Sequence, residues 1–236
     1  MTIFPRFESI MDNMEKIPIL IFRLEGPLQS WGERAKWNYR DTAGFPTKSG
    51  ICGLFSCALG YERDDERIGI MCSSLQIAVR ADRAGEELCD FHTIQADCLL
   101  SAEGKKRAGG NTVISQRYYL QDASFFVCVR GNEELLEKIA CALKKPRWTL
   151  YLGRKSCVPT VPPIGRISKE YGSLLEAIYR EPLSERHDES VYAEVDSLSG
   201  EGYDRPDIRD ISSDRDFKVR RVKLIKAGEK GEILCS

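Results

Sequence analysis

Apolar residues in the first sixty positions follow two different spacings, and each spacing predicts one element. Residues 17–24 are apolar on both faces, which is typical of a strand that is covered on both sides. A stripe at helical spacing follows, formed by Ile51, Leu54, Phe55, Ala58 and Leu59. Thr47 or Ser49 can cap this helix and Gly60 can stop it, so we expect a helix packed against a central strand.

The middle of the chain predicts further strands. Leu75–Arg80 has the pattern of a second strand, and Leu88–Thr93 is a candidate for a third. Apolar side chains alternate along Ser115–Leu120 and Ala123–Arg130, which predicts two antiparallel strands joined around residues 121–122. Between Thr93 and Val113 the pattern breaks, which suggests a protruding hairpin or finger with a basic tip. The alternative, which composition alone favours, is an ordinary solvated loop.

A second helix and a less regular C-terminal region complete the pattern. Asn132 can cap a helix that Pro146 stops. The elements up to this point predict an α+β domain, with a four-stranded antiparallel sheet and two helices on one face, the ferredoxin-like arrangement. Further on we expect a helix at Ser173–Tyr179 and strands at Ser190–Val195 and Phe217–Ile225, with an acidic loop rich in Gly and Asp before the last strand.

Length and composition fit one large globular domain, or one domain with an appendage. The chain has 236 residues, of which 42% are hydrophobic and 30% charged, which is enough apolar material for a full core. It has no apolar run long enough to span a bilayer, and its first sixteen residues lack the apolar centre of a signal peptide. We therefore expect a cytoplasmic protein with no membrane contact.

The nine cysteines predict core thiols and not a metal centre. Several lie in apolar segments, among them Cys52, Cys57, Cys128 and Cys141, where a thiol behaves as a small hydrophobe. The sequence has no CxxC pair and only two histidines, whereas structural zinc sites usually combine two close ligand pairs. We expect reduced cysteines, no metal and no cofactor.

The net charge of −1 conceals an uneven distribution. Residues 181–216 hold 4 basic and 12 acidic side chains, whereas residues 217–236 hold 6 basic and 2 acidic ones. Residues 144–169 hold seven Lys or Arg and no Asp or Glu, with Trp148 and Tyr151 among them. A run of one sign with interleaved rings favours a nucleic acid partner over an ordinary solvated face.

The segment Gly26–Gly60 contributes a second candidate surface for a polyanion. Its loop carries tryptophans, a tyrosine and several cations between two apolar elements, and its helix entry offers free N–H groups to a phosphate. The alternative for Trp31 and Trp37 is that they are core aromatics. The predicted RNA-binding residues of the whole chain are Arg34, Lys36, Arg40, Thr47, Lys48, Ser49, Gly50, Lys105, Lys106, Arg107, Arg117, Arg147, Arg154 and Lys155.

Five segments of this chain, in consistent order, resemble the diagnostic blocks of the CasD family. They are RLEGPLQSWG, FPTKSGICGLFSCALGYERDD, DFHT, RYYLQDASF and KPRWTLYLGRKSC. CasD proteins are RAMP-type subunits of type I-E CRISPR Cascade, which cap the 5′ handle of the guide RNA. The resemblance implies a ferredoxin-like RAMP (RRM-like) domain at 14–163, with a β-hairpin thumb at about 92–117. Residues 1–13 are then an extension, and residues 164–236 a small C-terminal region.

The resemblance implies a binding subunit and leaves an enzyme as the alternative. As a binding subunit the chain would hold the guide RNA beside a backbone subunit and a large subunit of Cascade, and would contact target DNA only indirectly. It would perform no chemistry. Relatives in type I-C systems, however, cut repeat RNA without a metal, and His92, Tyr118 and Lys105 could supply the acid and base for that reaction.

Overall fold

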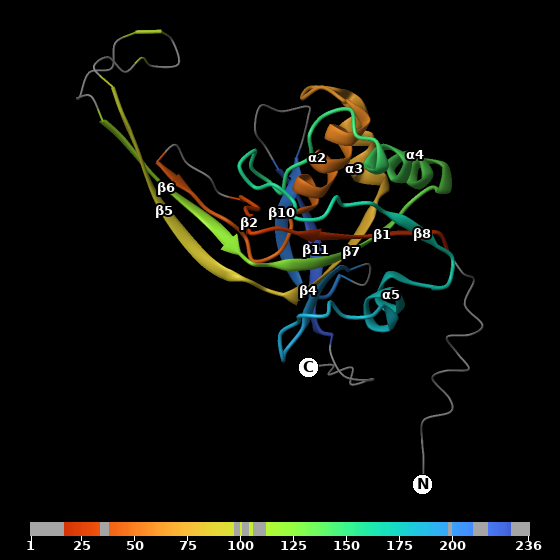
Figure 1. Cartoon of the computed structure of the whole chain (residues 1–236). Helices are drawn as coiled ribbons and strands as arrows, with labels where there is room; N and C mark the ends of the chain where they lie inside the picture. Colours follow the sequence, from red (N-terminus) through yellow and green to blue (C-terminus); the bar gives the residue numbers. More distant parts are fainter. Residues whose placement is uncertain are drawn as a thin grey trace.

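The protein has a mixed α/β fold built on a sheet of seven strands, with a smaller sheet beside it (Figure 1). The computed structural model describes residues 17–33, 38–96, 100, 104–105, 112–197, 200–209 and 217–227. The strand order of the large sheet is β10-β11-β9-β4-β7-β1-β8, and all of its pairings are antiparallel. None of the helices in these described ranges is long and apolar enough to cross a membrane.

Four strands form the middle and one edge of the large sheet. They are β1 (Ile19–Glu25), β4 (Gln76–Arg83), β7 (Ser124–Arg130) and β8 (Arg166–Ser168). Along β1, Leu20, Phe22 and Leu24 enter one buried cluster, whereas Ile19 and Ile21 enter another on the opposite face. The prediction of a strand covered on both sides is therefore confirmed.

Helices cover both faces of this sheet. Helices α2 (Lys48–Leu59), α3 (Glu66–Ser74) and α4 (Glu133–Lys144) pack on one face, and α5 (Leu174–Arg180) packs on the other (Figure 1). Thr47 caps α2 by accepting a hydrogen bond from the N–H of Gly50, and Gly60 ends it in the left-handed conformation. Asn132 caps α4 in the same way, so both predicted helices are confirmed.

The long hairpin of the small sheet projects away from the body of the molecule (Figure 1). Strands β5 (Glu86–Gln95) and β6 (Thr112–Gln121) pair along ten residues each. The short strands β2 (Leu28–Gln29) and β3 (Tyr39–Arg40) also pair with β6, which fixes the base of the hairpin to the body.

The predicted pairing of Ser115–Leu120 with Ala123–Arg130 is wrong. Strands β6 and β7 follow one another along the chain, but β6 pairs with β5 whereas β7 pairs with β1 and β4. Asp122, with φ of 55°, lies in the bend between them, where the chain leaves one sheet for the other. Two residues between strands can form a hairpin turn, but here they form a bend in a long ribbon.

The C-terminal residues extend the large sheet. Strand β9 (Tyr192–Asp196) pairs with β4, β11 (Phe217–Lys226) pairs with β9, and β10 (Tyr203–Arg209) forms the edge. The boundary that we predicted after residue 163 thus falls inside a continuous sheet, because β8 also follows that boundary.

The expectation of reduced cysteines is wrong for one pair. Cys52 of α2 and Cys72 of α3 form a disulfide, and their Cα atoms lie 5.8 Å apart. Their helical positions face each other across the α2–α3 contact, which a spacing of twenty residues in the sequence does not reveal. Cys128 is buried as predicted, but Cys141 is exposed.

Candidate nucleic-acid interface

Three predicted cations from distant parts of the sequence meet at the base of the projecting hairpin. Strand β3 pairs in parallel with β6 so that Arg40 lies directly opposite Arg117. Arg154 reaches the same place from the loop after α4, because its Nη2 donates to the carbonyl oxygens of Arg40 and Asp41 at 2.9 and 3.1 Å. We call Arg40, Arg117 and Arg154 the arginine cluster.

The register of the hairpin places this cluster on one face. Directly opposed residues share a face and successive residues alternate, so Arg117, Tyr119 and Ser115 are on the same side of β6. The guanidinium of Arg154 stacks over Tyr119, 4.8 Å from the ring centre. Its Nη1 is buried and has no hydrogen-bond partner among the described residues, which marks a polar group that a ligand or water could satisfy.

An acidic residue lies on the same face as the arginine cluster. Asp90 of β5 lies directly opposite Arg117 and is exposed on the same face of the hairpin. The Nε of Arg117 also donates to the Ser115 hydroxyl at 3.3 Å. Asp122, which follows β6 in the sequence, pairs with Arg83 and Arg186 instead of with Arg117.

Some of the other predicted cations are exposed, and the rest lie outside the described residues. Lys105, Arg147 and Lys155 are exposed. Arg147 also packs its side chain over Gly60, where an added Cβ would lie 2.6 Å from Arg147 Cγ. Four predicted residues lie outside the described part of the chain, namely Arg34, Lys36, Lys106 and Arg107, as do residues 1–13.

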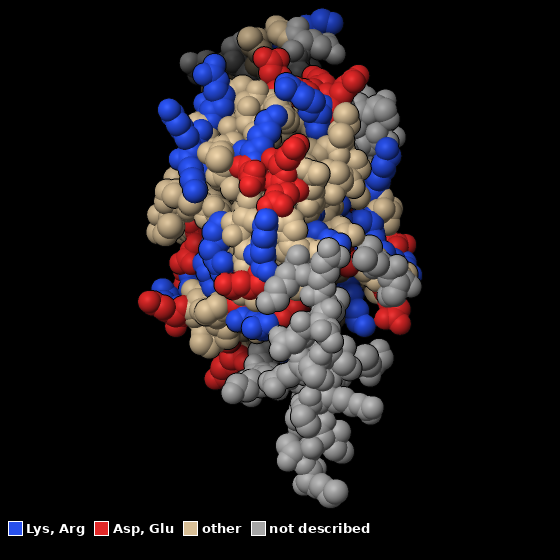
Figure 2. All heavy atoms as spheres, turned by 90° about the vertical axis from the view of Figure 1, so that its right-hand side faces the viewer, with Lys and Arg blue, Asp and Glu red and all other residues tan. Residues whose placement is uncertain are grey.

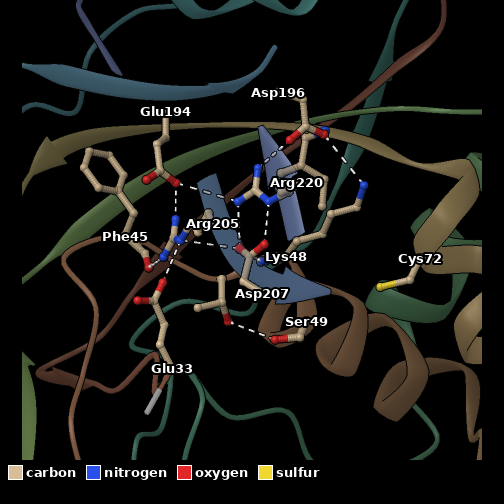
Figure 3. Close-up of polar contacts among 12 residues, drawn as sticks. Glu33, Phe45, Lys48, Ser49, Cys72, Glu194, Asp196, Arg205, Asp207 and Arg220 are labelled. Carbon is tan, nitrogen blue, oxygen red and sulfur yellow. Dashed lines mark hydrogen bonds and ion pairs between the residues drawn. The ribbon is translucent and has the colours of Figure 1, made fainter. Parts of the chain in front are cut away.

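The entry of α2 does not have the open geometry that we expected for a phosphate seat. The backbone N–H of Lys48 donates to Oδ2 of Asp207 at 2.8 Å, so a carboxylate already occupies this position (Figure 3). The N–H of Gly50 donates to Thr47 Oγ1, and the Ser49 hydroxyl donates to the same oxygen. Two of the N–H groups offered by the first turn are therefore satisfied within the protein.

Lys48 points into the protein. Its ammonium donates to the carbonyl oxygen of Leu75 at 2.6 Å and lies 3.7 Å from Asp196, and its side chain is only 7% exposed. Burial lowers the pKa of Lys48, although Asp196 opposes that effect. We therefore leave Lys48 out of the interface.

Lys48 belongs to a buried ionic network that joins α2 to the C-terminal strands (Figure 3). Arg220 of β11 binds Asp207 through Nε and Nη2 at 2.6 and 2.7 Å and also pairs with Asp196. Burial would lower the pKa of Arg220, but its hydrogen bonds to Asp207 outweigh burial and raise it. The two hydrogen bonds from Arg220 hold the side chain of Asp207 at the entry of α2.

Arg205 extends the network to the loop before α2. Its Nε lies 2.7 Å from Glu33, its Nη2 donates to the carbonyl oxygen of Phe45 at 2.9 Å, and its Nη1 pairs with Glu194. Burial raises the pKa of Glu194 above that of an ordinary carboxyl. Sequence reasoning did not identify Arg205 or Asp207, because both lie in the segment that looked like an acidic loop.

The three residues of the enzyme alternative do not gather on one face of the hairpin. His92 lies opposite Ser115, whereas Tyr118 lies opposite Cys89, and these positions alternate to opposite faces. A hydrogen bond with Cys89 raises the pKa of Tyr118 to about 12. The Nδ1 of His92 is buried without a hydrogen-bond partner in the described part of the chain.

The face that carries α4, β8 and α5 differs from the arginine cluster in how its charges are distributed. Figure 2 shows Lys and Arg interleaved with Asp and Glu over this face. Such mixing is typical of an ordinary solvated surface. Among the described residues, no group of three or more His, Cys, Asp or Glu is arranged to hold a metal ion.

Comparisons with known proteins give a consistent set of similarities. A family model described as "CRISPR-associated protein (Cas_Cas5)" matches residues 19–223. The CRISPR system Cascade subunit CasD of Escherichia coli (strain K12) is 37% identical over 157 residues, which cover 61% of this chain and 68% of that protein.

Two solved structures are similar over most of their length. A chain of a "CRISPR RNA-guided surveillance complex" matches with a TM-score of 0.72 and 32% identity, over 89% of this chain and 90% of that chain. A "Crystal structure of Cas protein" matches with a TM-score of 0.59 and 32% identity, over 88% of this chain and 94% of that chain.

Proposed function

The chain belongs to the Cas5 family of CRISPR-associated proteins, and on this premise we propose that it is a non-catalytic RNA-binding subunit of a CRISPR surveillance complex. It holds the 5′ handle of the guide RNA and joins the backbone and large subunits of a Cascade-type assembly. Its role in antiviral defence is to place that RNA, and target DNA meets the complex through the RNA.

The observation that carries this proposal is the arginine cluster. Arg40, Arg117 and Arg154 come from three separate segments and gather where the hairpin meets the body. Arginines suit phosphate oxygens because the guanidinium can donate two parallel hydrogen bonds. Tyr39 and Tyr118, whose ring centres lie 5.0 Å apart on the opposite face of β6, add aromatic surface that can stack on bases.

The architecture fits the same proposal. In the order β8-β1-β7-β4, with α2 and α4 on one face, we recognise the ferredoxin-like core of a RAMP domain. The β5–β6 hairpin is our candidate for the thumb. The separation of His92 from Tyr118 to opposite faces supports binding in preference to cutting, because acid and base must act on one phosphate.

Charge neutralisation at the interface tests the proposal. RNA binding of the full chain is measured against salt concentration for wild type, Arg117→Gln and Lys155→Gln. Each lost phosphate contact should weaken binding and reduce the slope of log K against log salt by roughly 0.7. The matched control is Arg130→Gln, an exposed arginine at the opposite end of β7 from the hairpin.

Unchanged salt slopes in both variants, or an equal loss in the Arg130→Gln control, would contradict the proposed interface. The question of cutting is separate. Repeat RNA incubated with the wild-type chain in EDTA should stay intact, whereas a specific cut that His92→Ala abolishes would establish the endoribonuclease instead.

A further inference from the structure

A cavity of about 250 Å³ lies beside the arginine cluster. Its walls come from the loop after β2, from one side of α2 between Ser49 and Cys57, and from the turn at residues 151–153. The cavity and the cluster share a framework, because the Ser30 hydroxyl donates to the carbonyl oxygen of Tyr118 and the Ser30 N–H donates to that of Leu152. The wall of the cavity is therefore bonded directly to the strand and the loop that carry the cluster.

The lining of the cavity is uncharged and combines polar with apolar residues. Ser30, Ser49 and Tyr151 line it together with Trp31 and Leu54, and no Lys, Arg, Asp or Glu is among the described residues of its wall. A phosphate would bind weakly there, because the side chain of Lys48 points into the protein and its backbone N–H donates to Asp207. The chemistry of the wall suits a neutral group that makes hydrogen bonds.

Glycines of α2 form part of the cavity wall. Two glycines of α2 face it, and they differ in what lies next to them. A Cβ on Gly50 would lie 2.8 Å from the Trp31 ring, so this glycine lets the indole pack against the helix. A Cβ on Gly53 would meet nothing within 4 Å, so bare backbone is exposed to whatever enters.

The volume sets the size of the occupant. Water takes roughly 30 Å³ per molecule, so the cavity has room for about eight waters. That is the space of one ring system, and it is too small for a nucleotide with its phosphate and neighbours. Unstacked bases are commonly held in this way, by rings and hydroxyls that meet their faces and edges.

We propose that this cavity takes one unstacked nucleobase of the bound RNA, while the adjacent phosphates lie on the arginine cluster. The inference rests on the proposed function, since it assumes that RNA is the ligand of the interface. Tyr151 and the exposed backbone at Gly53 contact the faces of the base. The hydroxyl oxygens of Ser30 and Ser49, whose protons are donated to Tyr118 and Thr47, accept hydrogen bonds from its edge. Selection among the bases then depends on these hydroxyls.

The test combines a filled cavity with RNA that lacks single bases. Gly53→Leu places an apolar side chain in the cavity and does not strain the helix, because leucine is the better helix former. The matched control is Gly44→Leu, a glycine outside the cavity wall that also has open space at its Cβ. The probe is the repeat-derived 5′-handle RNA, either intact or with one abasic site at each position in turn.

One abasic position should weaken binding to the wild-type chain about 10-fold, in line with the loss of one stacked base. Gly53→Leu should bind the intact RNA about 10-fold more weakly and should be insensitive to that same abasic site. Gly44→Leu should behave as wild type at every position.

Intact binding by Gly53→Leu, together with equal losses for wild type and variant at every abasic site, would overturn the base pocket and leave the proposed function standing. Failure of the wild-type chain to bind the intact RNA would overturn both. Circular dichroism melting of each variant shows that a loss does not come from unfolding.

Discussion

Lys48 shows at the residue scale how a cation can be hidden at the entry of a helix. The sequence places it between Thr47 and Ser49, two residues before Gly50, which is the local pattern of a phosphate site. Its actual partners, Leu75, Asp196 and Asp207, lie 27 to 159 positions away. Local patterns carry no information about such partners, so the position of the side chain could not be predicted.

We expect Lys48→Glu to destabilise the fold and to leave no separate effect on RNA. A third buried acid beside Asp196 and Asp207 should lower the free energy of unfolding by about 3–5 kcal/mol. Lys48→Met should cost less, because Asp196 keeps its pairing with Arg220. Urea denaturation measures both, and a stable Lys48→Glu protein that fails only in RNA binding would contradict this assignment.

The depressed pKa of Asp82 predicts how the free energy of unfolding depends on pH. Burial pushes the pKa of Asp82 up, but hydrogen bonds from Arg80 and Arg23 outweigh burial and hold the pKa below its ordinary value of 3.8. A carboxyl whose folded pKa is depressed stabilises the protein above the unfolded pKa. That stability is lost as pH falls through the folded pKa.

The free energy of unfolding should therefore fall as pH drops below about 4, and Asp82→Asn should flatten this dependence. The variant should also be less stable at pH 7 by about 3 kcal/mol, because Arg80 stays buried without its charged partner. Asp204→Asn, at an exposed pair with Arg221, serves as the control and should cost under about 1 kcal/mol. An acid dependence identical to wild type in Asp82→Asn would contradict the argument.

At the scale of elements, β10 shows why the sequence pattern failed to predict this strand although it predicted β1, β7 and β9. Strands β1, β7 and β9 carry apolar residues inward, so periodicity in the sequence identified them. The inward side chains of β10 include Arg205 and Asp207, which are 4% and 1% exposed. A strand whose buried face is ionic has no hydrophobic alternation, and its composition resembles a loop.

The disulfide between α2 and α3 makes the stability of this helix pair depend on redox conditions. It closes a loop of twenty residues, which corresponds to about 3 kcal/mol in the chain-entropy model. Dithiothreitol should therefore lower the urea midpoint of the wild-type chain. The Cys52→Ala/Cys72→Ala variant should have the same midpoint with and without reductant, and an equal response of both proteins would contradict the assignment.

The outer part of the β5–β6 hairpin should be dispensable for folding. Its described residues beyond the His92–Ser115 pair are exposed or half-buried, and none belongs to either core cluster. Replacing residues 93–114 by Asn-Gly supplies the turn that a two-residue hairpin favours. The melting temperature should change by only a few degrees, whereas a large fall would show that the hairpin supports the core.

At the scale of the whole molecule, the sequence predicted most elements but not their neighbours. Periodicity shows that Ser115–Leu120 and Ala123–Arg130 are strands, yet the bend at Asp122 decides which sheet each joins. The arginines of the interface were predicted singly from their charge. Their gathering depends on the β3–β6 pairing, and β3 has only two residues and no pattern of its own.

The buried ionic network limits the order in which parts of the chain can fold during synthesis. Asp196 and Asp207 take their arginine from β11, the last strand described, and Asp207 in turn binds the backbone at the start of α2. During synthesis these acids leave the ribosome before Arg220 exists to pair with them. The first half of the chain therefore cannot reach its final state on its own, and its folding is completed only after β11 has been synthesised.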